Sequence, residues 1–242
     1  MSKKDELDCL NAVKKCLLSK RIDKKLLKCF STAKVNEKTT EFPDFICDGG
    51  FIEHFQVSAA KENRKGSFHN ITENEFERYC NEALNNNCNE AVESKAKNLY
   101  DLSPTYELSV DKMSWESAPG EYSYNYFIES IKKNLINHIE SLHRCKVGIQ
   151  TCIFMAQYVG SRIYIEDNGK FSAVYTIAKD RNLLNYLTLY KSDLDYFLIV
   201  YNDCIDIIDM SKIDILIEQS PLNICFGVGR YKEIRLNLNI TL

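Results

Sequence analysis

The chain has 242 residues, of which 45% are hydrophobic and 27% charged, so it is long enough to bury a substantial core without disulfide or metal staples. Its formal net charge of −3 gives no bulk electrostatic case for binding nucleic acid, although a locally basic cleft is compatible with that charge. The longest apolar runs, such as residues 196–200, are too short to span a bilayer.

Ten cysteines are scattered along the chain, and no Cys-x-x-Cys pair occurs among them. Many lie among apolar neighbours, as Cys47 and Cys152 do. Because the first residues carry no apolar signal segment, these cysteines are interpreted as buried, reduced thiols of a cytoplasmic protein. A zinc site is not expected, since His138 and His143 are five residues apart and face different sides of a helix.

Two helices and a hairpin are predicted at the start of the chain. Apolar residues recur with a helical period over residues 5–20, and a second helix over 23–34 has Asp23 as its N-cap. The pattern then changes to two strands around Asp48-Gly49, a dipeptide typical of a two-residue type I′ turn.

The rest of the chain alternates between helical and strand-like patterns. A capping box that starts at Thr72 predicts a helix to about residue 84, and the longest helical pattern covers residues 122–143. Further helices are predicted at 89–98 and 179–190, and further strands at 105–115, 149–158, 162–165, 196–201, 204–210, 224–228 and 234–240. This order predicts a single α/β domain over residues 1–242, with a mixed central β-sheet flanked by helices and a helical insertion at about 72–120.

The predicted hairpin contains an unusual acidic pair. With Asp48 and Gly49 as the two turn residues, Asp44 lies directly opposite Glu53, where Cβ atoms are about 4.5–5.5 Å apart. Two facing carboxylates between apolar strands repel each other unless a cation lies between them. Mg²⁺ takes one or two carboxylates together with water and phosphate oxygens, and it can activate a bound water. A solvent-facing acidic pair on an edge hairpin is the alternative interpretation.

These residues resemble a motif of a known group. Pro43-Asp44, followed nine residues later by Glu53 on the next strand, resembles the PD-(D/E)XK nuclease superfamily. The resemblance covers residues 43–58 and the order of the elements. It implies a restriction-endonuclease-like α-β-β-β-α-β core, Mg²⁺ (or Mn²⁺) bound by Asp44 and Glu53, and a Lys two residues after the Glu that orients or activates water.

The chain departs from the motif at the position of the Lys, which is Phe55. Some nucleases of this superfamily carry Gln instead of Lys, which makes Gln56 a candidate third catalytic residue, although it lies on the opposite pleat unless a β-bulge realigns it. Lys61 is a second candidate for the missing ammonium.

A three-residue turn that included Gly50 would change the register of the hairpin. Asp44 would then pair with His54, and His54 would lie beside Gln56 in a degenerate His-x-Gln motif. The two-residue turn is preferred because Asp-Gly favours it.

The resemblance implies a Mg²⁺-dependent endonuclease that hydrolyses DNA in restriction or phage defence, with Asp44, Glu53 and Gln56 as catalytic residues. DNA is then the expected partner, no membrane is involved, and a homodimer is compatible with the sequence. Because the motif Lys is absent, a catalytically inactive nuclease-fold protein that acts as a binding or interaction module is the alternative. The third hypothesis is an unrelated α/β interaction protein in which the hairpin has only a structural role. The sequence leaves the three open.

Overall fold

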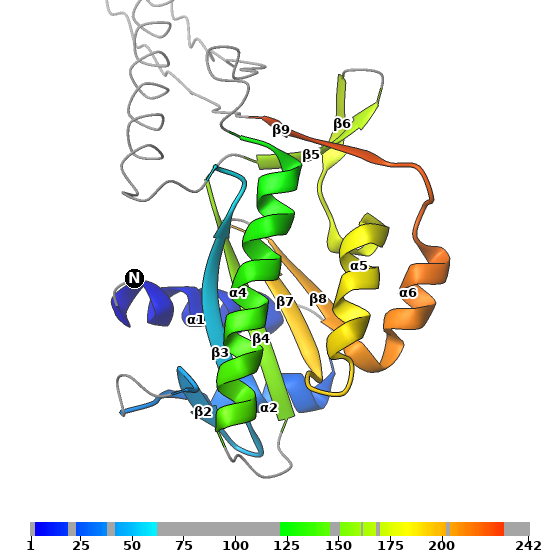
Figure 1. The fold of residues 1–242 in the computed structure, drawn as a ribbon. Coiled ribbons are helices and arrows are strands. Elements are labelled where there is room, and N and C mark those ends of the chain that lie inside the picture. Colours follow the sequence, from blue (N-terminus) through cyan, green and yellow to red (C-terminus); the bar gives the residue numbers. More distant parts are fainter. Residues whose placement is uncertain are drawn as a thin grey trace, which may run out of the picture.

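The computed structural model describes residues 3–18, 23–37, 42–61, 122–145, 151–160, 162–167, 170–201 and 204–229. Within these ranges a six-stranded mixed sheet carries helices on both of its faces (Figure 1). The expected fold class, α/β with a mixed central sheet flanked by helices, is therefore confirmed. The helical insertion predicted at about 72–120 and the last predicted strand, 234–240, lie outside the described residues.

The central sheet has the strand order β1-β2-β3-β4-β7-β8. The first three strands form an antiparallel meander, β3, β4 and β7 run parallel, and β8 pairs antiparallel with β7. Their bounds are Lys34–Val35, Phe45–Cys47, Gly50–Ser58, Thr151–Val159, Tyr196–Val200 and Ile205–Asp209. All five residues of β7 are buried, which explains why its sequence is a continuous apolar run and not an alternation of apolar and polar residues.

Helices α1 (Lys3–Leu18) and α2 (Lys24–Thr32) cover one face of the sheet. The fully buried Leu10 and Val13 of α1 belong to the same hydrophobic cluster as Ile52 of β3. Asp23 caps α2 by accepting a hydrogen bond from the backbone N–H of Lys25 at 2.7 Å, as the sequence predicts. We refer to this side as the α1 face.

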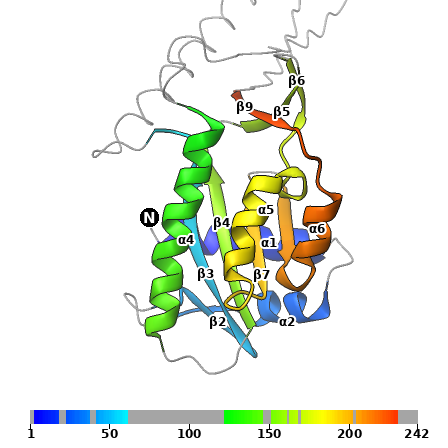
Figure 2. The ribbon, with the colours of Figure 1, turned by 45° about the vertical axis from the view of Figure 1, so that its right-hand side comes forward.

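Helices α4 (Tyr124–Arg144), α5 (Arg181–Leu187) and α6 (Ile213–Gln219) cover the other face (Figures 1 and 2). The buried apolar residues of α4 recur every fourth position, which gives the helix one apolar stripe. They are Phe127, Ile131, Leu135 and Ile139. This stripe packs on alternate residues of β3, among them Phe51 and Phe55. We refer to this side as the α4 face.

The residues that follow β3 and those that precede α4 lie next to each other. The backbone N–H of Ser123 donates to the carbonyl of Ala59 at 2.9 Å, and Ala60 forms an antiparallel bridge with Tyr122. Ser123 also caps α4 by accepting from the N–H of Tyr126. These contacts fix where the helix begins above the strand.

A second, three-stranded sheet has the order β6-β5-β9. Strands β5 (Arg162–Asp167) and β9 (Cys225–Gly229) overlap predicted strands, whereas β6 (Lys170–Val174), β1 and α6 were not predicted. Short 3₁₀ turns complete the described part of the chain at Ile177–Lys179, Thr188–Tyr190 and Met210–Lys212. The unpredicted elements are short, so their own sequence carries little periodic signal and their pairing partners determine them.

A buried carboxylate lies where α4 and α5 meet. Asp180 is fully buried and caps α5, accepting from the N–H of Leu183 at 3.0 Å. Its Oδ2 accepts from the hydroxyls of Tyr124, at 2.6 Å, and Tyr175, at 2.7 Å. Burial and the Asp180 charge raise the pKa of both tyrosines well above the usual range, so both hydroxyls stay protonated and donate.

No disulfide joins the cysteines of the described residues. The expectation of buried thiols is confirmed for Cys9, Cys29, Cys47 and Cys152, whereas Cys16, Cys145 and Cys204 are half-buried and Cys225 is exposed. Within the described ranges, no helix combines the length and the apolar character needed to cross a bilayer.

Candidate active site

The register of the β2–β3 hairpin is the one that the two-residue turn predicts. Cys47 pairs with Gly50, Ile46 with Phe51 and Phe45 with Ile52, so Asp48 and Gly49 alone form the turn. Gly49 has a φ of +78°, the left-handed conformation that favours glycine. The three-residue alternative is therefore wrong, and the pairing places Asp44, just before β2, opposite Glu53.

The two acids exchange hydrogen bonds with each other's strand. The backbone N–H of Asp44 donates to Glu53 Oε2 at 3.1 Å, and the backbone N–H of His54 donates to Asp44 Oδ2 at 2.8 Å. Asp44 is half-buried, while Glu53 is only 5% exposed and lies on the α4 face. The interpretation of a solvent-facing acidic pair is thus wrong for Glu53.

Helix α4 supplies the third polar group of the site. His138 Nδ1 lies 2.6 Å from Glu53 Oε1, and because a carboxylate accepts, Nδ1 is the donor. The imidazole stacks on Phe55 with ring centroids 4.9 Å apart and an angle of 18° between the planes. Phe55, which occupies the position of the motif Lys, is buried. A nitrogen group therefore reaches Glu53 from α4 instead of from β3.

Gln56 does not join Asp44 and Glu53. Strand β3 pairs with β4 over nine consecutive positions, from Gly50 to Ser58, and no bulge interrupts the ladder. Gln56 therefore stays on the α1 face, where its Nε2 donates to Gln157 Oε1 at 3.4 Å. The expected catalytic role of Gln56 beside the two acids is not supported by this geometry.

The other residues considered for the site also lie away from it. His54 points to the α1 face and shares Gln157 Oε1 at 3.1 Å, and burial lowers the pKa of His54 to about 4. Lys61 follows the end of β3, and the strand from Glu53 to Ser58 alone spans roughly 16 Å at the usual rise per residue. The Lys61 ammonium therefore does not reach Glu53.

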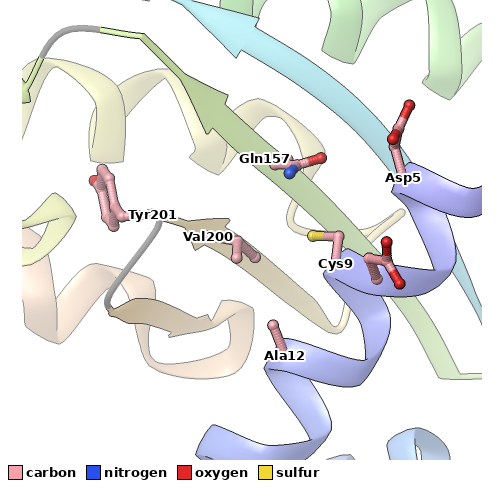
Figure 3. Close-up of a pocket in the computed structure, with 7 residues that line it drawn as sticks. Asp5, Cys9, Ala12, Gln157, Val200 and Tyr201 are labelled. Carbon is pink, nitrogen blue, oxygen red and sulfur yellow. The ribbon is translucent and has the colours of Figure 1, made fainter.

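A cavity of about 270 Å³ opens on the α1 face, on the other side of the sheet from Glu53. Figure 3 shows its wall: Cys9 and Ala12 of α1 face Gln157 of β4 and Val200 of β7, and Asp5 lies near the start of the helix. Gln157 connects this cavity to His54 and Gln56. The described residues thus place one polar cluster on each face of β3.

The carboxylate oxygens of Asp44 and Glu53 are the type of ligand that a hard divalent cation such as Mg²⁺ prefers. Glu53 accepts one hydrogen bond on each oxygen, and since a carboxylate offers about four lone pairs, both oxygens retain acceptor capacity. The described residues contain no group of three or more His, Cys, Asp or Glu side chains around one point. The pair therefore fits Mg²⁺, which keeps several waters, better than a cation that needs a full protein cage.

His138 was missed as a site residue when only the sequence was considered. Its position three residues after Leu135 places it at the edge of the apolar stripe of α4, which was the available signal.

The chain has no significant similarity to known proteins: no family model, no curated protein and no solved structure matches it.

Proposed function

We propose that this protein is a Mg²⁺- or Mn²⁺-dependent nuclease that hydrolyses phosphodiester bonds of DNA. The observation that carries the proposal is the placement of Asp44 and Glu53 opposite each other on the β2–β3 hairpin. Two adjacent acids, of which Glu53 is buried and Asp44 half-buried, favour a cation between them. Restriction or phage defence, the setting that the motif implies, belongs to the same proposal.

The order of the elements supports the proposal. Helices α1 and α2 precede the antiparallel meander β1-β2-β3, α4 follows, and β4 then pairs parallel to β3. This is compatible with the α-β-β-β-α-β order of the restriction-endonuclease-like core. Asp44 directly precedes the middle strand of the meander, and Glu53 lies on its last strand.

Asp44 and Glu53 would hold the cation. When bound, Mg²⁺ would lower the pKa of a coordinated water and polarise the phosphodiester. The protein orients both ligands before any metal arrives: the N–H of His54 fixes Asp44, and the N–H of Asp44 and the imidazole of His138 fix Glu53. Such supporting hydrogen bonds keep ligand carboxylates in a productive orientation.

A cleavage assay tests the proposal. Purified protein should cut linear or plasmid DNA with Mg²⁺ or Mn²⁺, and EDTA should abolish the cleavage. Asp44→Asn and Glu53→Gln should also abolish it, because each removes a charged metal ligand. Asp193→Asn is the matched control, since Asp193 pairs with the exposed His143 at the C-terminal end of α4 and not with Asp44 or Glu53. No cleavage by the wild type, or equal cleavage by Glu53→Gln, would contradict the proposal.

The second candidate is a nuclease-fold protein without catalysis, which acts as a binding module. The observation that favours it is the buried stack of Phe55 on His138 at the position of the motif Lys. If the wild type cleaves neither DNA nor RNA with Mg²⁺ or Mn²⁺ but binds a protein partner, the binding function is supported and the nuclease function is wrong.

A further inference from the structure

Two thiols meet where helix α2 packs against strand β2. Cys29 lies on the buried side of α2, and Cys47 is the last residue of β2. Both are buried, and both belong to the hydrophobic cluster on the α1 face. The thiol of Cys47 donates a hydrogen bond to the sulfur of Cys29. Neither cysteine is part of a disulfide in this structure, so the two sulfur atoms form a reduced pair in direct contact.

The backbone on both sides of the pair is held by further contacts. Cys47 pairs with Gly50 in the hairpin, and the next residue, Asp48, donates its backbone N–H to Thr32 Oγ1 at 2.9 Å. Thr32 is on the same helix as Cys29, less than one turn further along. The end of α2 is therefore joined to the turn of the hairpin, and the fold itself keeps the two sulfur atoms next to each other.

The surroundings of Cys29 favour its thiolate. The hydrogen bond from Cys47, a second one from Thr151 and the nearby ammonium of Lys25 lower the pKa of Cys29 to about 7, although burial opposes them. Donating its hydrogen bond to Cys29, together with burial, raises the pKa of Cys47 above the usual range, so Cys47 stays protonated. Cys9 lacks such support, and burial raises its pKa to about 12. The pair thus consists of one nucleophilic sulfur and one thiol that can join it.

We propose that Cys29 and Cys47 are a site of reversible oxidation, at which a peroxide joins α2 to the β2–β3 hairpin through a disulfide. The thiolate of Cys29 attacks one oxygen of hydrogen peroxide, the O–O bond breaks, and the departing hydroxide takes a proton from solvent, which leaves Cys29 as a sulfenic acid. The sulfur of Cys47 then attacks the sulfur of Cys29, and its proton leaves with the hydroxyl group as a second water. Two thiols are oxidised and one peroxide is reduced to two waters. The inference does not depend on the proposed nuclease function.

Peptide mapping after oxidation tests the site. Reduced wild type is treated with hydrogen peroxide in native buffer, its remaining thiols are alkylated in denaturant, and the chain is digested without reduction. We expect a pair of peptides joined through Cys29 and Cys47, which dithiothreitol separates. Cys29→Ala and Cys47→Ala should each abolish this pair. Cys9→Ala is the matched control and should form it to the same extent as the wild type, because Cys9 is also buried on the α1 face but outside the pair.

The disulfide should also change the stability of the fold. It would close residues 30–46 into a covalent loop and so restrict the unfolded chain. The oxidised wild type should therefore unfold at a temperature about 5 °C or more above that of the reduced protein, and dithiothreitol should reverse the shift. Cys47→Ala treated in the same way should show no such shift.

Two results would overturn the inference. One is the absence of the joined peptides at a peroxide concentration that already oxidises the exposed Cys225. The other is a link between Cys29 and Cys47 that forms only after the chain has been unfolded in urea. Should the alanine variants fail to fold, the joined peptides of the native wild type and their separation by dithiothreitol decide instead.

Discussion

The backbone N–H of Asp44 donates a hydrogen bond to Glu53 Oε2 at 3.1 Å, so the strand that carries one acid also orients the carboxylate of the other. The reciprocal contact runs from the N–H of His54 to Asp44 Oδ2. The geometry of the two acids therefore depends on the register of the hairpin, and anything that shifts the register separates them.

Asp44→Asn should weaken Mn²⁺ binding by at least about 10-fold, because it removes a charged ligand while keeping the shape of the side chain. Isothermal titration calorimetry without DNA measures the affinity directly. Asp193→Asn serves as the control, since Asp193 lies outside the site. Equal affinities for Mn²⁺ in Asp44→Asn and the wild type would remove Asp44 from the ligand set.

Gly50→Ala should destabilise the protein by about 2 kcal/mol, within the range for overpacking a tight contact. A Cβ at position 50 would lie 2.4 Å from the carbonyl oxygen of Thr151, so β3 and β4 would have to separate. Gly49→Asn should cost less than about 1 kcal/mol, because no atom lies near a Cβ there and Asn tolerates a positive φ. Urea unfolding of both variants tests the pair. A similar loss for both would show that the close approach at Gly50 is not what requires glycine.

Asp180→Asn should lower the free energy of unfolding by about 3 kcal/mol, since the amide cannot accept from two tyrosine hydroxyls and the Leu183 N–H as the carboxylate does. Thermal and urea unfolding measure the loss. Asp214→Asn, which breaks an exposed pair with Lys191, should cost less than about 1 kcal/mol. A comparable cost for the two variants would mean that the buried carboxylate adds nothing beyond a surface pair.

Phe55→Lys should reduce stability by about 3 kcal/mol through loss of a buried ring, without increasing cleavage while His138 occupies the adjacent space. Combining Phe55→Lys with His138→Ala makes room for the ammonium beside Glu53. The double variant should therefore cut faster than Phe55→Lys alone, which a double-mutant cycle on the cleavage rate quantifies. Strictly additive effects would show that the two side chains do not share that space.

The hairpin register could be predicted because Asp48-Gly49 specifies its own turn locally. The side on which Gln56 lies followed from the two-residue period of a strand, and nine uninterrupted pairs with β4 left no bulge to change it. Both predictions used interactions between residues close in sequence.

The contact between Glu53 and His138 could not be predicted in the same way. The two residues are 85 positions apart, and they meet only because the apolar stripe of α4 docks on β3. Helix α6 was missed for a related reason, since its seven residues, Ile-Asp-Ile-Leu-Ile-Glu-Gln, are too few to show a helical period and place Ile at every second position, as a strand would. Its buried Ile213 anchors it to the core, a tertiary effect.

The adjacent contacts of Ala59 with Ser123 and of Ala60 with Tyr122 make the intervening chain a closed loop in the sense of polymer physics. The entropy of closing such a loop grows only with the logarithm of its length, so doubling the length adds about 0.6 kcal/mol. The sheet and α4 therefore place little constraint on how many residues lie between their joined ends. The number of residues between these two junctions can therefore change at little cost to the hairpin that holds the two acids in place.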